Sequence, residues 1–191
     1  MINEERDLVL TQRKEGVIVP PMSEDAIAGA ARVLRRVLGL EQVRRLPIEM
    51  VYEMLWLFDD DARFEVVEDS LLGSDEARTY PDRSLILLRE SVYDGAAHGE
   101  CRSRFTMCHE LGHLGLHRGV SFARIDPAAP PKIYENSEWQ ADVFASHLLM
   151  PTHLIQGYTC VEAVMGDFGV SRAAAITRLT KMRKGAMKQA S

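Results

Sequence analysis

Apolar residues recur at helical spacing in several stretches of the chain, and polar residues separate them. One apolar stripe predicts a helix over residues 24–38, with Ser23 as its N-cap and Gly39 at its end. A second helix is expected to begin at Pro47, a residue favoured in the first turn, and to run to Phe58. The first third of the chain is therefore expected to be helical.

The middle and the end of the chain carry further helical patterns. Residues 100–116 contain no proline and place apolar side chains three and four positions apart. Residues 138–150 show the same stripe and stop before Pro151. Two shorter patterns, 161–168 and 171–184, follow it, and the text around their junction resembles a helix-turn-helix. These segments predict two central helices and a helical C-terminal part.

Strand-like runs lie between the helical patterns, at residues 62–67 and 84–88, with a shorter one at 77–80. Helices and a few strands together predict an α+β fold. We take 84–88 as the candidate edge strand.

Length and composition place limits on the class of protein. The chain has 191 residues, 46% of them hydrophobic, which is enough for a sizeable core, and a net charge of −5, which argues against a protein that coats nucleic acid. No apolar run approaches membrane-spanning length, and the acidic N-terminus does not resemble a signal peptide. The three cysteines show no C-x-x-C pair, as in a reducing compartment. We therefore expect a cytoplasmic protein without a membrane segment.

Basic residues gather in the last segment, 171–191, which has six of them and no acidic residue. Such a segment could contact DNA or an acidic partner, but a solvated helix face is the simpler interpretation. DNA binding through 171–191 is therefore considered unlikely and stays open.

The strongest chemical signal is the sequence HELGH within the predicted helix 100–116. His109 and His113 lie one turn apart on the same face, so both imidazoles can reach one metal ion. Glu110 lies beside them, in position to take a proton from a water molecule. The pattern is typical of zinc peptidases.

A third ligand has to come from elsewhere. The pattern H-E-x-x-H-x-x-G-x-x-H fails, because Leu116 and Gly119 stand where the glycine and the third histidine would be. His117 follows His113 by four residues and lies about 6 Å further along a straight helix. We expect His117 to be a cap or an outer contact of the site and not a ligand.

Two carboxylates in the predicted helix 138–150 are better candidates. Glu138 and Asp142 are four residues apart and share a face. One can bind the metal, and the other can orient a ligating imidazole through its free N–H.

The text around these residues resembles a known family. Residues 105–117 are similar to the signature RFTxAHELGHxxLH of the ImmA/IrrE zinc metallopeptidases, and residues 138–151 to that family's block ExxANxFAxxLLMP. The resemblance implies a zincin-like fold, with a small antiparallel sheet packed on the active-site helix and additional helices at both ends. The resemblance is strongest over residues 78–151 and poor before residue 60. From the order of the predicted elements we expect an N-terminal helical segment (1–60), a metallopeptidase core (61–155) and a C-terminal helical, helix-turn-helix-like segment packed on the core (156–191).

The resemblance also implies a site and a function. His109, His113 and Glu138 would bind Zn²⁺, with Mn²⁺ as a possible substitute, and Glu110 would be the general base. Asp142, at a position where the family usually has Asn, and His117 would contact the ligands from outside. The implied activity is cleavage of a helix-turn-helix repressor, which releases stress-response or mobile-element genes.

Three further points stay open. Tyr80, His98 and Arg104 are candidates for stabilising the oxyanion. The connection 118–132, rich in proline, is a candidate lid. The alternative function is a regulatory binding module, or a component of a toxin–antitoxin pair, that acts by holding a partner without proteolysis.

Overall fold

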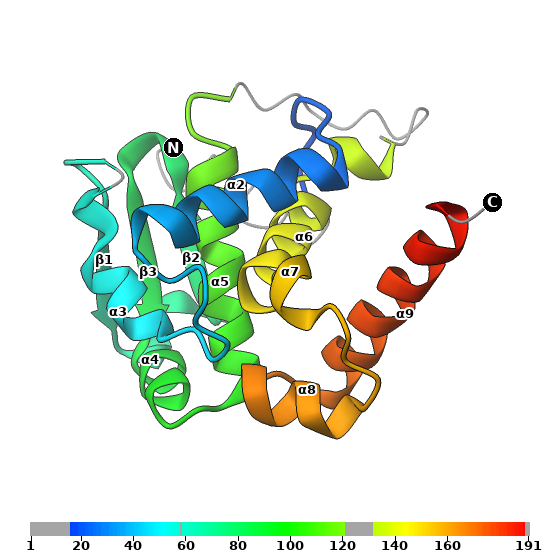
Figure 1. Ribbon diagram of the computed structural model, residues 1–191. Coiled ribbons are helices and arrows are strands. Elements are labelled where there is room, and N and C mark those ends of the chain that lie inside the picture. Colours follow the sequence, from blue (N-terminus) through cyan, green and yellow to red (C-terminus); the bar gives the residue numbers. More distant parts are fainter. Residues whose placement is uncertain (1–15, 58, 121–131, 190–191) are drawn as a thin grey trace.

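The structure is a computed structural model that describes residues 16–57, 59–120 and 132–189 (Figure 1). The α-helices are α2 (Glu24–Val37), α3 (Ile48–Glu53), α4 (Glu90–Ala97), α5 (Cys101–Leu116), α6 (Ser137–Leu149), α7 (Thr152–Ile155), α8 (Val161–Phe168) and α9 (Arg172–Gln189). The strands are β1 (Arg63–Val67), β2 (Ala77–Tyr80) and β3 (Leu85–Arg89). Short 3-10 helices are η2 (Leu55–Leu57), η3 (Asp69–Leu72), η4 (Pro81–Arg83) and η5 (Ile133–Glu135).

The predicted α+β fold is confirmed, and most helices begin and end close to the expected residues. The Ser23 hydroxyl accepts a hydrogen bond from the Ala26 N–H, as expected of the N-cap of α2. The helix expected from Pro47 to Phe58 is shorter, because α3 ends at Glu53 and the chain tightens into η2. Phe58 lies outside the described residues.

The sheet has three strands in the order β1-β3-β2, and its strand directions are mixed. β3 pairs with β2 in antiparallel register, from Ala77 opposite Leu88 to Tyr80 opposite Leu85. β3 pairs with β1 in parallel register. The expectation of a wholly antiparallel sheet is therefore wrong for one of the two pairs.

The expectation that 84–88 is an edge strand is also wrong, since β3 is the central strand. Ile86 and Leu88 are fully buried. The uninterrupted apolar run of β3 is what a strand with neighbours on both sides requires. The edge strand next to α5 is β2, whose Thr79 contacts that helix.

The core is built in layers around α5, which lies between the sheet and α6 (Figure 1). α2 packs against α6. Buried apolar side chains from Ile27 to Leu179 form one cluster, so the three expected segments share a core, and their boundaries stay a prediction. Among the described residues, no helix is both long enough and apolar enough to cross a membrane.

The C-terminal helix α9 is anchored by a buried arginine. Arg178 is 4% exposed, and its guanidinium contacts the His147 ring of α6 at 3.1 Å and donates to the Met150 carbonyl at 3.1 Å. Lys181 pairs with Glu24 of α2 at 3.4 Å. Arg178 thus stabilises the fold and does not present its charge to DNA, which leaves less support for a DNA-binding role of 171–191.

The two central helices approach each other closely at one glycine. A Cβ atom built on Gly112 of α5 would lie 3.0 Å from the Ala141 Cα and 3.2 Å from its carbonyl oxygen. Both atoms belong to the backbone of α6 and cannot rotate away. Glycine at this position therefore permits the α5–α6 packing that the structure shows.

We predict that Gly112→Ala lowers the free energy of unfolding by about 1–2 kcal/mol, because overpacking costs more than the helix propensity of alanine returns. Gly115→Ala is the matched control in the same helix, since a Cβ there has no neighbour within 4 Å. It should be neutral or stabilise the protein by up to about 1 kcal/mol. Urea denaturation of both variants tests this, and an equal effect would contradict it.

Acid should weaken the anchor of α9. Burial and the Arg178 charge outweigh the opposing effect of Glu24 and lower the pKa of His147 from its usual 6.5 to about 4. The unfolded chain therefore binds a proton at a higher pH than the folded chain, and stability is lost as the pH falls from 6.5 towards 4.

We expect this loss to be about 1–3 kcal/mol in the wild type and smaller in His147→Gln, which keeps a hydrogen-bond acceptor for Arg178. The measurement is the unfolding free energy at several pH values between 4 and 7. Parallel curves for the two proteins would show that His147 is not the group responsible.

Candidate metal centre

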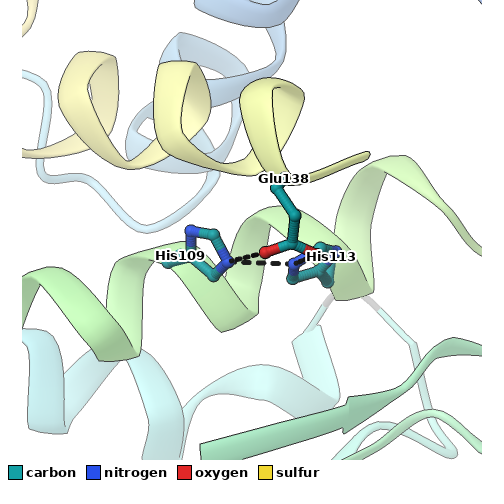
Figure 2. Close-up of side chains that lie close together, drawn as sticks. All are labelled: His109, His113 and Glu138. Atoms are coloured by element: carbon teal, nitrogen blue, oxygen red, sulfur yellow. Dashed lines mark hydrogen bonds and ion pairs between the residues drawn. The ribbon is translucent and has the colours of Figure 1, made fainter. Parts of the chain in front are cut away.

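The candidate site lies where α5 faces the first turn of α6 (Figure 2). The helical spacing places His109 and His113 on one face of α5, and Glu138 points at them from α6. The start of α6 is fixed by Asn136, whose side-chain oxygen accepts a hydrogen bond from the Trp139 N–H at 3.0 Å. The N-cap therefore determines where Glu138 meets the two histidines.

The donor atoms of the three residues converge. The Nε2 atoms of His109 and His113 lie 2.9 Å apart, and they lie 3.2 and 3.3 Å from the two carboxylate oxygens of Glu138. One ligand atom from each residue falls within 4.8 Å of the others, so the group could hold a metal ion. Two imidazole nitrogens and one carboxylate oxygen are the donor set of many catalytic zinc sites, which keep one position open.

The outer nitrogen of each histidine has its own partner. The Nδ1 atom of His109 lies 2.9 Å from the Asp142 carboxylate, and the Nδ1 atom of His113 lies 3.1 Å from Nδ1 of His117. Both rings are thereby held with Nε2 towards Glu138. The structure thus brings Asp142 and His117 to the positions that the sequence suggests, as outer contacts of the site.

The charges of these groups depend on one another. Burial disfavours the charged form of His109, but hydrogen bonds to Asp142 and Glu138 outweigh it and raise the pKa of His109 to about 10. Burial acts against the ionised Glu138 too, yet hydrogen bonds to His109 and His113 hold its pKa well below its usual range. Burial and the neighbouring His113 lower the pKa of His117 to about 4, so its ring is neutral at neutral pH.

Glu110 lies one residue after His109 and is turned towards the sheet. Its carboxylate accepts a hydrogen bond from the Thr79 hydroxyl of β2 at 2.5 Å, and the residue is only 8% exposed. Thr79 was not singled out from the sequence, because its contact with Glu110 depends on how β2 packs on α5. The alternation of side chains in 77–80 gives only a weak signal for it.

The three oxyanion candidates lie in different surroundings. Arg104 is buried, and its guanidinium donates to the carbonyls of Leu46 and Gly169, which leaves less support for a role at the oxyanion. His98 ends α4 and bonds to the Asp94 carbonyl. It precedes α5, and its role at the oxyanion stays a prediction.

Tyr80 ends β2, next to Thr79, and its hydroxyl accepts a hydrogen bond from Arg78 at 3.5 Å. It stays a candidate. The connection proposed as a lid falls mostly on residues 121–131, which lie outside the described residues.

Comparison with known families identifies the family of this chain. Residues 62–180, more than half of the chain, match the family model of the IrrE N-terminal-like domain (Peptidase_M78). The chain therefore belongs to this metallopeptidase family, as the sequence motifs predicted. Membership implies a bound metal ion, and the His109, His113 and Glu138 group could bind it.

One solved structure with a similar fold is that of a Mycobacterium tuberculosis transcriptional regulator, with a TM-score of 0.54 and 14% sequence identity. The match covers 84% of this chain and 52% of that one, so this chain spans about half the length of the regulator. The likeness concerns the fold alone. No curated protein matches the sequence significantly.

The Thr79 contact leads to a prediction about stability. Thr79→Val keeps the shape of the side chain but leaves the buried Glu110 carboxylate without this donor, so it should cost about 1–3 kcal/mol of unfolding free energy. Thr79→Ser keeps the hydroxyl and should lose clearly less. Chemical denaturation of the two variants measures the difference, and equal losses would assign the effect to packing instead of the hydrogen bond.

Proposed function

We propose that the protein is a zinc-dependent metalloendopeptidase that cleaves a helix-turn-helix transcriptional repressor. The observation that carries this proposal is the convergence of His109, His113 and Glu138 beside a buried glutamate, in a chain of a metallopeptidase family. Bound zinc would activate a water molecule and polarise the scissile carbonyl.

The residues of the chain would supply the remaining chemistry. Glu110 would accept a proton from the attacking water and deliver it to the leaving amine. The Thr79 hydroxyl would keep the Glu110 carboxylate turned to one side through the hydrogen bond at 2.5 Å. Asp142 and His117 would hold the ligand rings in place.

The substrate would lie along β2. This strand is at the edge of the sheet and packs on α5 beside Glu110, so an extended peptide could add to it through main-chain hydrogen bonds. Such binding tolerates many side chains, and the selection of one repressor would then rest on other contacts. Cleavage of the repressor would release stress-response or mobile-element genes.

The choice of a repressor as the substrate rests mainly on the resemblance to the ImmA/IrrE family. The similar fold of a protein described as a transcriptional regulator is loosely in agreement with it. Because this chain spans about half of that regulator, any function of the regulator's remaining part does not transfer to it.

We predict that Glu110→Gln abolishes cleavage while keeping the metal. The test mixes the zinc-loaded protein with the helix-turn-helix protein encoded beside its gene and follows cleavage on gels. The rate should fall by a factor on the order of 100 to 10,000, the usual contribution of a general base. If the partner stays whole with the wild type but co-purifies with it, the binding-module or toxin–antitoxin alternative replaces the protease.

A second variant tests the ligand set. Glu138→Ala should lower zinc affinity by more than about 100-fold, since loss of an outer contact alone costs 10- to 100-fold. The circular dichroism spectrum should be unchanged, because Glu138 is a half-buried residue of the first turn of α6. Metal analysis after dialysis gives the answer, and full zinc occupancy in this variant would remove Glu138 from the site.

A further inference from the structure

A chain of buried hydrogen bonds leads away from His113. Its Nδ1 atom lies 3.1 Å from Nδ1 of His117, and the Nε2 atom of His117 lies 3.1 Å from the side-chain oxygen of Gln140. The Gln140 amide nitrogen donates to the carbonyls of Pro20 at 2.9 Å and Tyr134 at 2.8 Å. His117 and Gln140 are each 1% exposed, so solvent has little access to either.

The contacts of the Gln140 amide with two carbonyls fix the donor and the acceptor of every hydrogen bond between Gln140 and His113. A carbonyl can only accept, and two carbonyls take both hydrogens of the Gln140 amide. A rotated amide would place its oxygen against two other oxygens. The Gln140 oxygen must therefore face His117 and accept a hydrogen bond from it.

These directions determine the tautomers of His117 and His113. Gln140 requires a proton on Nε2 of His117, and the buried ring faces two partners, Gln140 and His113, that carry no negative charge to stabilise a second proton. Nδ1 of His117 is therefore a lone pair and accepts a hydrogen bond from Nδ1–H of His113. The Nε2 atom of His113 is left with its lone pair towards Glu138, as a metal ligand requires.

We propose that Gln140 is a positioning residue that selects the metal-binding tautomer of His113 through His117. The role of the metal rests on the proposed function, whereas the tautomers are a property of the protein alone. The arrangement differs from that of His109, whose outer nitrogen contacts the exposed Asp142 directly.

The hydrogen-bonded series of His113, His117 and Gln140, called the relay below, also reaches the N-terminal segment. Pro20 belongs to a stretch that is held against η5 by backbone hydrogen bonds, from Val19 N–H to the Glu135 carbonyl at 2.8 Å and from Met22 N–H to the Tyr134 carbonyl at 3.1 Å. These bonds place the Pro20 carbonyl where it accepts from Gln140. The tautomer of His113 therefore depends on a segment more than 90 residues away in the sequence.

The test uses long-range ¹H–¹⁵N NMR correlations of the full chain labelled with ¹⁵N-histidine. The chain has six histidines to assign. In the zinc-free wild type at pH 7, His117 should be neutral with its proton on Nε2. After zinc is added, His113 should carry its proton on Nδ1. A proton on Nδ1 of His117, or a charged His117 ring, would overturn the proposal without any variant.

Two variants separate the relay from packing. Gln140→Met is similar in volume but cannot accept from His117, so the single His117 tautomer should be lost and zinc affinity should fall about 10- to 100-fold. Gln140→Met made in a His117→Phe background, where the hydrogen-bonded series is already broken, should cause little further loss of zinc affinity, whereas a packing defect would add its full cost. An unchanged tautomer and zinc affinity in Gln140→Met would overturn the proposal.

The result for zinc is independent of the result for the tautomers. A wild type that shows the expected His117 tautomer but binds no zinc would support the relay and overturn the metallopeptidase proposal. A wild type that binds zinc while His117 carries its proton on Nδ1 would support the metal site and overturn the proposed role of Gln140.

Discussion

Helices α5 and α6 meet at Gly112 and Ala141, where no side chain of α5 stands between the two backbones. The candidate metal centre depends on this contact, because His109 and His113 come from one helix and Glu138 from the other. A shift of a few tenths of an ångström between the helices is already comparable with the tolerance of metal–ligand bonds. The small residue inside the HELGH motif is therefore part of the site, although it has no functional group.

The second requirement is that each ligand keeps one orientation and one protonation state. The two histidines meet it in different ways. His109 relies on Asp142, whose carboxylate is more than half exposed, whereas His113 relies on the buried pair His117 and Gln140. Water can compete for the exposed contact between His109 and Asp142 more easily than for the buried contacts of His117 and Gln140. His113 is therefore the more rigidly held of the two histidines.

The sequence predicted the parts of this protein that depend on local spacing. Helix α5 and the one-turn separation of His109 and His113 follow from periodicity, and the carboxylate helix α6 ends before Pro151 as expected. Strand order does not follow from local pattern, since β3 could be placed only by its partners on both sides. The contacts of Thr79 and Gln140 arise from packing between distant segments, so no spacing rule could have revealed them.

The claim that the α5–α6 contact creates a metal centre is tested most directly by X-ray absorption at the zinc edge of the zinc-loaded protein. The structure predicts two imidazole nitrogens and one carboxylate oxygen at about 2.0–2.2 Å, with a further light atom in the open position. Sulfur at about 2.3 Å, or a spectrum without imidazole scattering, would contradict the prediction.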